Sequence, residues 1–129
     1  LVRMLATLHD REQRVAVPGF YDDVIPPGTA EREALAALPV SDSDFLRETG
    51  APLLGGEAGY TTVERIGIRP TAEINGLTSG YQGEGTKTVL PSLASAKLTF
   101  RLVPNQNPEH VMDLVEKHLQ SVLVPGVEM

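Results

Sequence analysis

The sequence predicts an α+β fold, a two-layer sandwich in which two helices cover one face of an antiparallel sheet. Apolar residues alternate strictly along 94–102, which is typical of a strand with one buried face. A looser alternation runs along 71–78, with Ala72, Ile74 and Gly76 on one side, and a glycine-rich connection separates the two stretches, so we expect them to pair as antiparallel neighbours. Beyond Asn107 the apolar residues recur at helical spacing.

The two helices expected to cover the sheet differ in how clearly their ends are marked. Asn107 is a typical N-cap, Pro108 suits the first helical position, and the apolar stripe that follows comprises Val111, Leu114, Val115, Leu119, Val122 and Leu123. The other helix is expected at the start of the chain, ending at 10–13. It has no capping residue before its apolar positions, which are Leu1, Met4, Leu5 and Leu8.

A polar insertion of about residues 18–68 is expected to separate the first helix from the sheet. Within it, a short helix capped by Thr29 is expected to run to Leu38. Ser41 with Asp44 resembles the capping box of a second helix that ends at the next glycine. A single helical turn at most is expected just before the strands begin.

The order of these elements predicts a known topology. The chain reads helix, insertion, strand, strand, helix, and then 127–129, which looks like the opening of another strand. This order matches a ferredoxin-like βαββαβ domain that lacks its first strand. We therefore expect residues 1–129 to form a single domain that is truncated at both ends.

Composition narrows the functional classes. The chain has 11 basic and 17 acidic residues, a net charge of −6, so the phosphate backbone of a nucleic acid would be repelled. It contains no cysteine, hence neither a disulfide framework nor a thiolate site. No apolar run approaches the roughly 18 residues of a membrane span, and no signal peptide opens the chain. We expect a cytoplasmic protein that binds neither nucleic acid nor membrane.

No catalytic or metal-binding motif stands out. The segment from Gly80 to Thr88 resembles a P-loop superficially, but it leads into a strand and lacks the helix N-terminus that would hold phosphate. The Gly-x-Ser-x-Gly pattern of a serine nucleophile does not occur. His9, His110 and His118 have no partners at metal-ligand spacing, and His118 is expected to be partly buried or to face the helix dipole. We expect no catalytic residue and no metal ligand in this chain.

Two places near the expected hairpin could nevertheless contact a ligand. Arg101 falls on the polar face of its strand, and an outward planar guanidinium there suits bidentate binding of a carboxylate. The alternative is a surface arginine without a functional contact. In the connection, glycines free the backbone to approach a ligand, and Lys87 and Thr88 add a cation and a hydroxyl. The alternative is a plain hairpin connection.

Several spaced blocks resemble a single known family. They are Arg69-Pro70-Thr71-x-Glu73-x-Asn75-Gly76, Gly83-Glu84-Gly85-Thr86-Lys87-Thr88-Val89-Leu90-Pro91, Arg101-Leu102-Val103-Pro104-Asn105 and Pro108-Glu109-x-Val111. Together they resemble the lid, or dimerisation, domain of carnosinase-like dipeptidases. These enzymes belong to the aminoacylase and succinyl-diaminopimelate desuccinylase superfamily of two-zinc metallopeptidases. The blocks follow the family's order and span nearly the whole chain.

The resemblance implies a lid and dimerisation module that forms a homodimer. It would be joined to a catalytic domain of the parent enzyme, which would bind zinc and hydrolyse a dipeptide or small peptide. This chain alone would then be inactive. By position, the resemblance assigns Thr88 in Lys-Thr-Val-x-Pro and Arg101 in Arg-Leu-Val-Pro to holding the substrate's carboxylate or backbone. The family's Asp-x-His-Ser-Gly strand, whose histidine reaches the neighbouring subunit's active site, would precede Leu1.

A second class of function fits the same order of elements. A non-catalytic ferredoxin-like module for oligomerisation or small-molecule sensing would show the same succession of helices and strands. A His-x-Asp metal motif in the flanking sequence of the parent protein would favour the peptidase, and its absence would favour this alternative.

Overall fold

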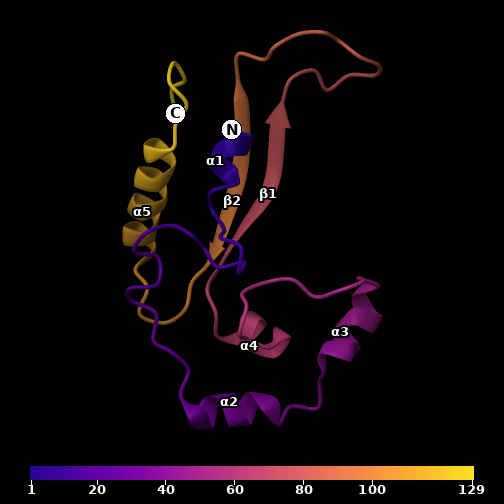
Figure 1. Ribbon diagram of the computed structural model, residues 1–129, viewed down its shortest axis with the longest axis vertical. Coiled ribbons are helices and arrows are strands. Elements are labelled where there is room, and N and C mark those ends of the chain that lie inside the picture. The colour runs from indigo at the N-terminus through magenta and orange to yellow at the C-terminus, as the bar shows by residue number, and fades with distance from the viewer.

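The computed structural model describes all 129 residues as one β-hairpin with five helices (Figure 1). The elements in chain order are α1 (Val2–Leu5), α2 (Thr29–Ala36), α3 (Asp42–Thr49), α4 (Thr62–Gly67), β1 (Thr71–Ser79), β2 (Ala94–Arg101) and α5 (Pro108–Ser121). The strands pair antiparallel, as the alternation predicted. α1 and α5 lie beside the hairpin, whereas α2, α3 and α4 gather at one end of it. The α+β class is confirmed. Only two strands of the expected ferredoxin-like order are present.

The hydrophobic core lies between one face of the hairpin and the helices α1 and α5. Its buried members are Leu5, Leu8, Val15, Val17, Phe20, Ala72, Val111 and Val115. Leu98 and Phe100 of β2 pack against this cluster, as the strict alternation of that strand predicted. The ring of Phe20, which is 2% exposed, lies 6.3 Å from the ring of Phe100. The opposite face of β2 is therefore turned towards solvent.

A β-bulge in β1 changes which of its residues share a face. The register shifts between Ile74 and Gly76, so Asn75 is the extra residue. Beyond the shift, Leu77 takes the face of Ile74, and Gly76 lies on the polar face. The prediction that Gly76 shares a face with Ile74 was wrong, because a period of two does not anticipate an inserted residue. The Asn75 side chain accepts a hydrogen bond from the Thr99 hydroxyl at 2.7 Å, across the polar face.

The first helix is much shorter than predicted. α1 ends at Leu5, and the chain then turns so that His9 and Val15 form an isolated antiparallel bridge. The Asp10 carboxylate accepts a hydrogen bond from the backbone N–H of Arg14 at 2.8 Å, which closes the turn. An aspartate that bonds its own local backbone competes with helix formation. The turn at 10–14 therefore takes the place of the predicted helix end at 10–13, and α1 itself stops earlier, at Leu5.

Capping residues placed α3 and α5 correctly. Ser41 and Asp44 form the capping box of α3, which ends at Gly50 in the left-handed region with φ of 68°. The Asn107 side chain accepts hydrogen bonds from two backbone N–H groups at the start of α5. These signals were readable because each involves residues within four positions of one another.

Two other boundaries differ from the prediction. Gly28, not Thr29, is the N-cap of α2, and it offers no side-chain hydrogen bond. Thr29 is the first helical residue, and α2 ends at Ala36. The strand predicted at 127–129 was wrong. A strand needs a paired neighbour, and the sheet pairs only β1 with β2.

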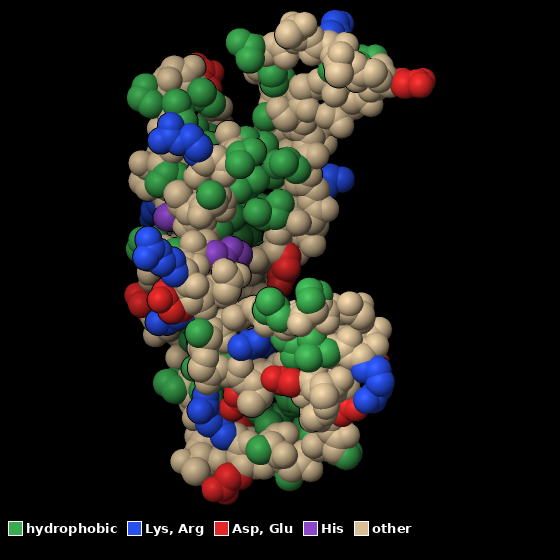
Figure 2. All heavy atoms as spheres, turned by 45° about the vertical axis from the view of Figure 1, so that its right-hand side comes forward, with side chains coloured by type: hydrophobic (Ala, Val, Ile, Leu, Met, Phe, Trp, Pro, Cys, Tyr) green, Lys and Arg blue, Asp and Glu red, His purple; other side chains and the backbone are tan.

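The hairpin leaves apolar and backbone groups at the surface. Ile74 and Leu77 of β1 are 47% and 52% exposed, and each strand has one unpaired edge. Figure 2 shows hydrophobic side chains gathered over this part of the molecule. Unpaired strand edges next to apolar side chains are typical of surfaces that pair with another chain. No helix is both long and apolar enough to cross a lipid bilayer.

Candidate functional site

Arg101 is the last residue of β2, on the solvent-facing side of the hairpin. Its Nη1 donates a hydrogen bond to the carbonyl oxygen of Ile66 at 2.8 Å. Ile66 lies in the last turn of α4, where a helix leaves carbonyl groups without intrahelical partners and carries partial negative charge. The remaining N–H groups of the guanidinium make no other hydrogen bond within the chain, so they are available to a carboxylate.

Thr88 lies exposed in the connection between the two strands, residues 80–93. Tyr81 organises this connection. Its hydroxyl donates to the carbonyl of Glu84 at 3.2 Å, and the Lys87 ammonium lies 5.7 Å from its ring centroid. A Cβ on Gly83 would overlap the same ring, so glycine lets the chain pass close to it. The connection contains no helix and leads into β2, as the sequence predicted.

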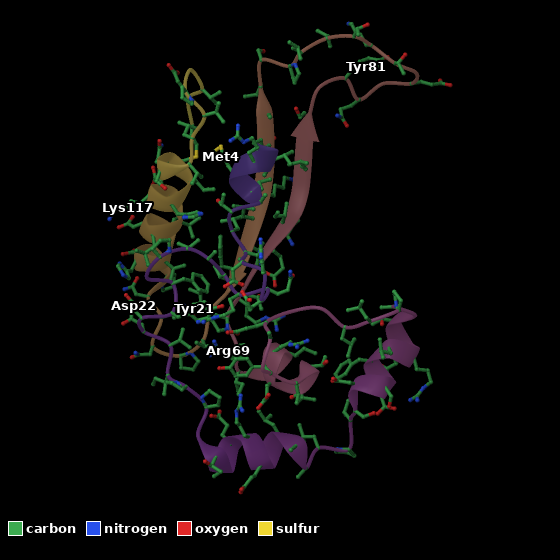
Figure 3. The ribbon with its side chains drawn as sticks, in the orientation of Figure 1. Met4, Tyr21, Asp22, Arg69, Tyr81 and Lys117 are labelled. Atoms are coloured by element: carbon green, nitrogen blue, oxygen red, sulfur yellow. The ribbon has the colours of Figure 1, made fainter.

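The structure does not bring Thr88 and Arg101 together. Arg101 ends β2 and Thr88 precedes its first residue, and the strand between them spans seven residue steps, or about 23 Å at roughly 3.3 Å per step. Figure 3 shows the same separation through labelled neighbours. Tyr81 marks the connection, and Arg69, just before β1, lies at the far end of the hairpin. One protomer therefore presents two separate candidate contacts.

A buried ion pair at that end of the hairpin was not anticipated from the sequence. Arg69 donates from Nε and Nη2 to the two carboxylate oxygens of Glu57, at 2.7 and 2.8 Å. The two side chains are 5% and 7% exposed. Hydrogen bonding to Glu57 raises the pKa of Arg69 above its usual value. Glu57 sits in a glycine-rich stretch without periodicity, and the only local signal was the proline that follows Arg69.

Aromatic rings and a third charge surround this ion pair. The Arg69 guanidinium lies 4.3 Å from the ring centroid of Tyr60 and 5.3 Å from that of Tyr21. Arg14 Nε lies 3.4 Å from the Glu57 carboxylate, on the outer side. Tyr21 and Arg69 lie close together beneath the hairpin in Figure 3. A cavity of about 150 Å³ adjoins them, and Tyr21, Glu57 and Arg69 are among the residues that line it. The cluster joins segments distant in sequence, so we interpret it as structural.

Tyr21 makes this cluster sensitive to alkaline pH. Burial raises the pKa of its hydroxyl above 10, although the backbone N–H of Val15, which donates to it at 3.1 Å, lowers it. Below pH 10 the phenol is neutral in both folded and unfolded chains. Above about pH 10 the unfolded chain loses this proton first, so stability should fall as pH rises towards the folded pKa.

We therefore expect the free energy of unfolding of the wild-type protein to fall more steeply above pH 10 than that of Tyr21→Phe. Urea unfolding at a series of pH values measures both slopes, and the difference isolates Tyr21 from the other groups that titrate there. Identical slopes would contradict a buried neutral phenol at this position.

The side chains of this domain do not fit a metal ion. No three of its histidine, aspartate and glutamate side chains lie close enough to coordinate one ion together. His118 is half-buried in the last turn of α5, where its Nε2 forms a hydrogen bond with the Thr7 hydroxyl at 2.8 Å. That placement agrees with the structural role predicted for it.

The fold and these features define the class of the chain: an α+β domain with an exposed hairpin and a helical insertion at the base of the hairpin. Its sequence matches the peptidase dimerisation domain family of M20 enzymes over residues 1–127. The chain therefore belongs to the M20 peptidase dimerisation domains.

Curated relatives and solved structures agree with this membership. The chain is 28% identical to the human Beta-Ala-His dipeptidase over 122 residues, and 27% identical over 122 residues to the Cys-Gly metallodipeptidase of Schizosaccharomyces pombe. Each alignment covers 95% of this chain, and 24% and 26% of the relatives. It thus spans about a quarter of the length of the curated relatives it matches.

Two solved structures show the same fold. An M20 family metallo-carboxypeptidase from Sulfolobus solfataricus superposes with a TM-score of 0.79 at 37% identity, covering 93% of this chain and 31% of that one. Human carnosine dipeptidase 1 superposes with a TM-score of 0.81 at 27% identity, covering 94% and 26%. The resemblance inferred from the spaced sequence blocks is confirmed.

Proposed function

We propose that this chain is the lid and dimerisation domain of a zinc-dependent dipeptidase, and that it positions the substrate by binding its terminal carboxylate. The observation that carries this proposal is Arg101, an outward guanidinium with one N–H bonded to the Ile66 carbonyl and the rest available. The names of the relatives support a peptide substrate, since two are dipeptidases and one solved structure is a metallo-carboxypeptidase. A free carboxylate is the group that a dipeptide offers to such an arginine.

In this proposal, another domain of the parent protein binds the zinc and carries out the hydrolysis. No metal ligand set exists in this domain, so its own contribution is to bind and orient the peptide. A cytoplasmic location is part of the same proposal. The exposed apolar side chains and free strand edges of the hairpin support pairing with a second copy.

The length of the hairpin adds a geometric condition. A dipeptide spans roughly 7 Å when extended, whereas Arg101 ends a strand of about 23 Å and Thr88 lies in the connection before the other end of that strand. One substrate cannot contact both residues of the same protomer in this conformation. We therefore infer that each active site combines Arg101 of one subunit with Thr88 of its partner.

Mixing two inactive variants of the full-length protein tests this arrangement. Thr88→Val removes the hydroxyl with little change of shape, and Arg101→Ala removes the guanidinium. The test dipeptide is whichever of β-alanyl-histidine and cysteinyl-glycine the wild-type protein hydrolyses better. Each variant alone should hydrolyse this test dipeptide poorly. After denaturation and refolding together, about half the dimers are mixed and each mixed dimer holds one intact site of two, so about a quarter of wild-type activity should return.

The control is the same procedure applied to each variant alone, which should restore nothing. Failure of the mixture to recover activity would show that the active site is not shared between subunits in this way. Full activity of both single variants would contradict the proposal and favour a non-catalytic oligomerisation module.

A further inference from the structure

We propose that Arg65 is a positioning residue that holds α4 so that the Ile66 carbonyl keeps Arg101 ready for the substrate carboxylate. This inference rests on the proposed function of Arg101. The Arg65 side chain bonds to backbone carbonyl groups of the preceding loop and makes no hydrogen bond with Arg101. Its role would be exerted through the helix to which both it and Ile66 belong.

The Arg65 side chain ties α4 to the loop before it. Its Nε donates to the carbonyl of Glu57 at 2.9 Å, and its Nη1 donates to the carbonyl of Gly55 at 2.6 Å. The stem passes so close to Gly56 that a Cβ there would lie 2.9 Å from Arg65 Cδ. Gly56 also has a φ of 107°, in the region that favours glycine. The loop and the arginine are therefore fitted to each other.

The contacts of Glu57 lead back to Arg101. Glu57 is bound through both carboxylate oxygens by Arg69, which is buried. Arg69 stands two residues before Thr71, and Thr71 is paired with Arg101 across the hairpin. The links from Arg101 through Ile66, Arg65, Glu57, Arg69 and Thr71 thus form a closed ring. Within this ring Arg101 is the one side chain with N–H groups turned to solvent at the end of β2.

A closed ring limits where the Arg101 guanidinium can go. An arginine at a strand end would otherwise sample several rotamers, and ordering it would cost free energy each time substrate binds. Holding one N–H on a carbonyl at the negative end of α4 orders it in advance, and the other N–H groups stay available. Loss of the Arg65 ties should release α4 and weaken binding of a carboxylate in particular.

Steady-state kinetics of the full-length protein tests this role. Arg65→Ala is expected to lower kcat/KM for the test dipeptide about three- to tenfold, chiefly by raising KM, because one ordered side chain is released. The C-terminal amide of the test dipeptide should be affected less than about twofold, since it has no carboxylate. Arg65→Lys, which keeps one donor nitrogen in place of two, should recover part of the loss. As a control, Arg47→Ala removes an exposed arginine of α3 that is paired with Asp44. It should leave kcat/KM unchanged for both the dipeptide and the amide.

A double-variant comparison separates positioning from general structural damage. In an Arg101→Ala background, Arg65→Ala should cause no further loss, because the group that it positions is gone. Where Arg65→Ala does not fold, Arg65→Met keeps the stem over Gly56 and removes both hydrogen bonds.

Three results would overturn the inference. They are no loss with Arg65→Ala, equal losses for the dipeptide and its amide, or the same loss with and without Arg101. If instead Arg101→Ala itself lowers kcat/KM equally for the dipeptide and for its amide, the proposed carboxylate contact is wrong. The role assigned to Arg65 is then wrong as well. If Arg101→Ala lowers kcat/KM more for the dipeptide than for the amide, but Arg65→Ala causes the same loss with and without Arg101, only the positioning role of Arg65 is overturned.

Discussion

Replacing Arg101 with alanine in the full-length protein is expected to lower kcat/KM for the test dipeptide by about 30-fold to several-thousand-fold. Removing one partner of a desolvated charge pair costs about 2–5 kcal/mol, which corresponds to that range. Arg101→Lys should also impair turnover, because an ammonium does not reproduce the two parallel N–H donors of a guanidinium. Steady-state kinetics on folded, dimeric variants measures both effects.

The substrate amide is the decisive comparison for Arg101. An amide lacks the carboxylate, so the full-length wild-type protein should hydrolyse it poorly, and its kcat/KM should fall much less on substitution of Arg101. Lys97→Ala provides a matched control, since Lys97 is an exposed cation on the same face of β2, four residues before Arg101. Equal losses for dipeptide and amide would show that Arg101 does not recognise the carboxylate. A loss with Lys97→Ala as large as that with Arg101→Ala would point to the general charge of this face.

The parts of the fold that were predictable from sequence are those encoded by neighbouring residues. The strict alternation of β2 placed Arg101 outward, and the structure has it on the solvent-facing side. Asn107 with Pro108 marked the start of α5, and Ser41 with Asp44 marked that of α3, because a cap and its partners lie within one turn. Local chemistry of this kind needs no knowledge of the rest of the chain.

The parts that were missed depend on contacts between distant residues or on a competing local bond. The bulge at Asn75 interrupts a period of two, and Asp10 closes a turn by accepting a hydrogen bond from the backbone of Arg14, where a helix was expected to continue. The pair of Glu57 and Arg69 joins a loop to the residue before a proline, twelve positions apart. Neither side chain carries a pattern that indicates its burial.

For the same reason, the sequence predicted the residues of the candidate site but not the contacts between them. The spaced motifs singled out Thr88 and Arg101, and alternation oriented Arg101. The two residues lie towards opposite ends of β2, so one protomer keeps them apart. The link between Arg101 and Ile66 spans 35 positions and involves a backbone carbonyl, which no sequence motif can mark.

Breaking the buried ion pair is expected to have the largest effect on stability. Arg69→Met should lower the free energy of unfolding by about 3–5 kcal/mol, because it leaves the Glu57 carboxylate buried without its bidentate partner. The side chains are 5% and 7% exposed, so water cannot replace the lost hydrogen bonds without opening the cluster. Arg14 approaches Glu57 only at 3.4 Å and is itself half exposed, so it compensates weakly. Urea unfolding followed by circular dichroism measures the change.

The double variant Glu57→Leu with Arg69→Met tests the cause of this loss. If an orphaned charge is responsible, removing Glu57 as well should return part of the stability, since no buried charge then lacks a partner. The tyrosine rings that flank Arg69 would pack against the methionine and the leucine. If the double variant is instead as unstable as the sum of the two single variants, the lost stability comes from packing and not from the unpaired carboxylate. In that case the ring of contacts that holds Arg101 would depend on the shape of these side chains more than on their charge.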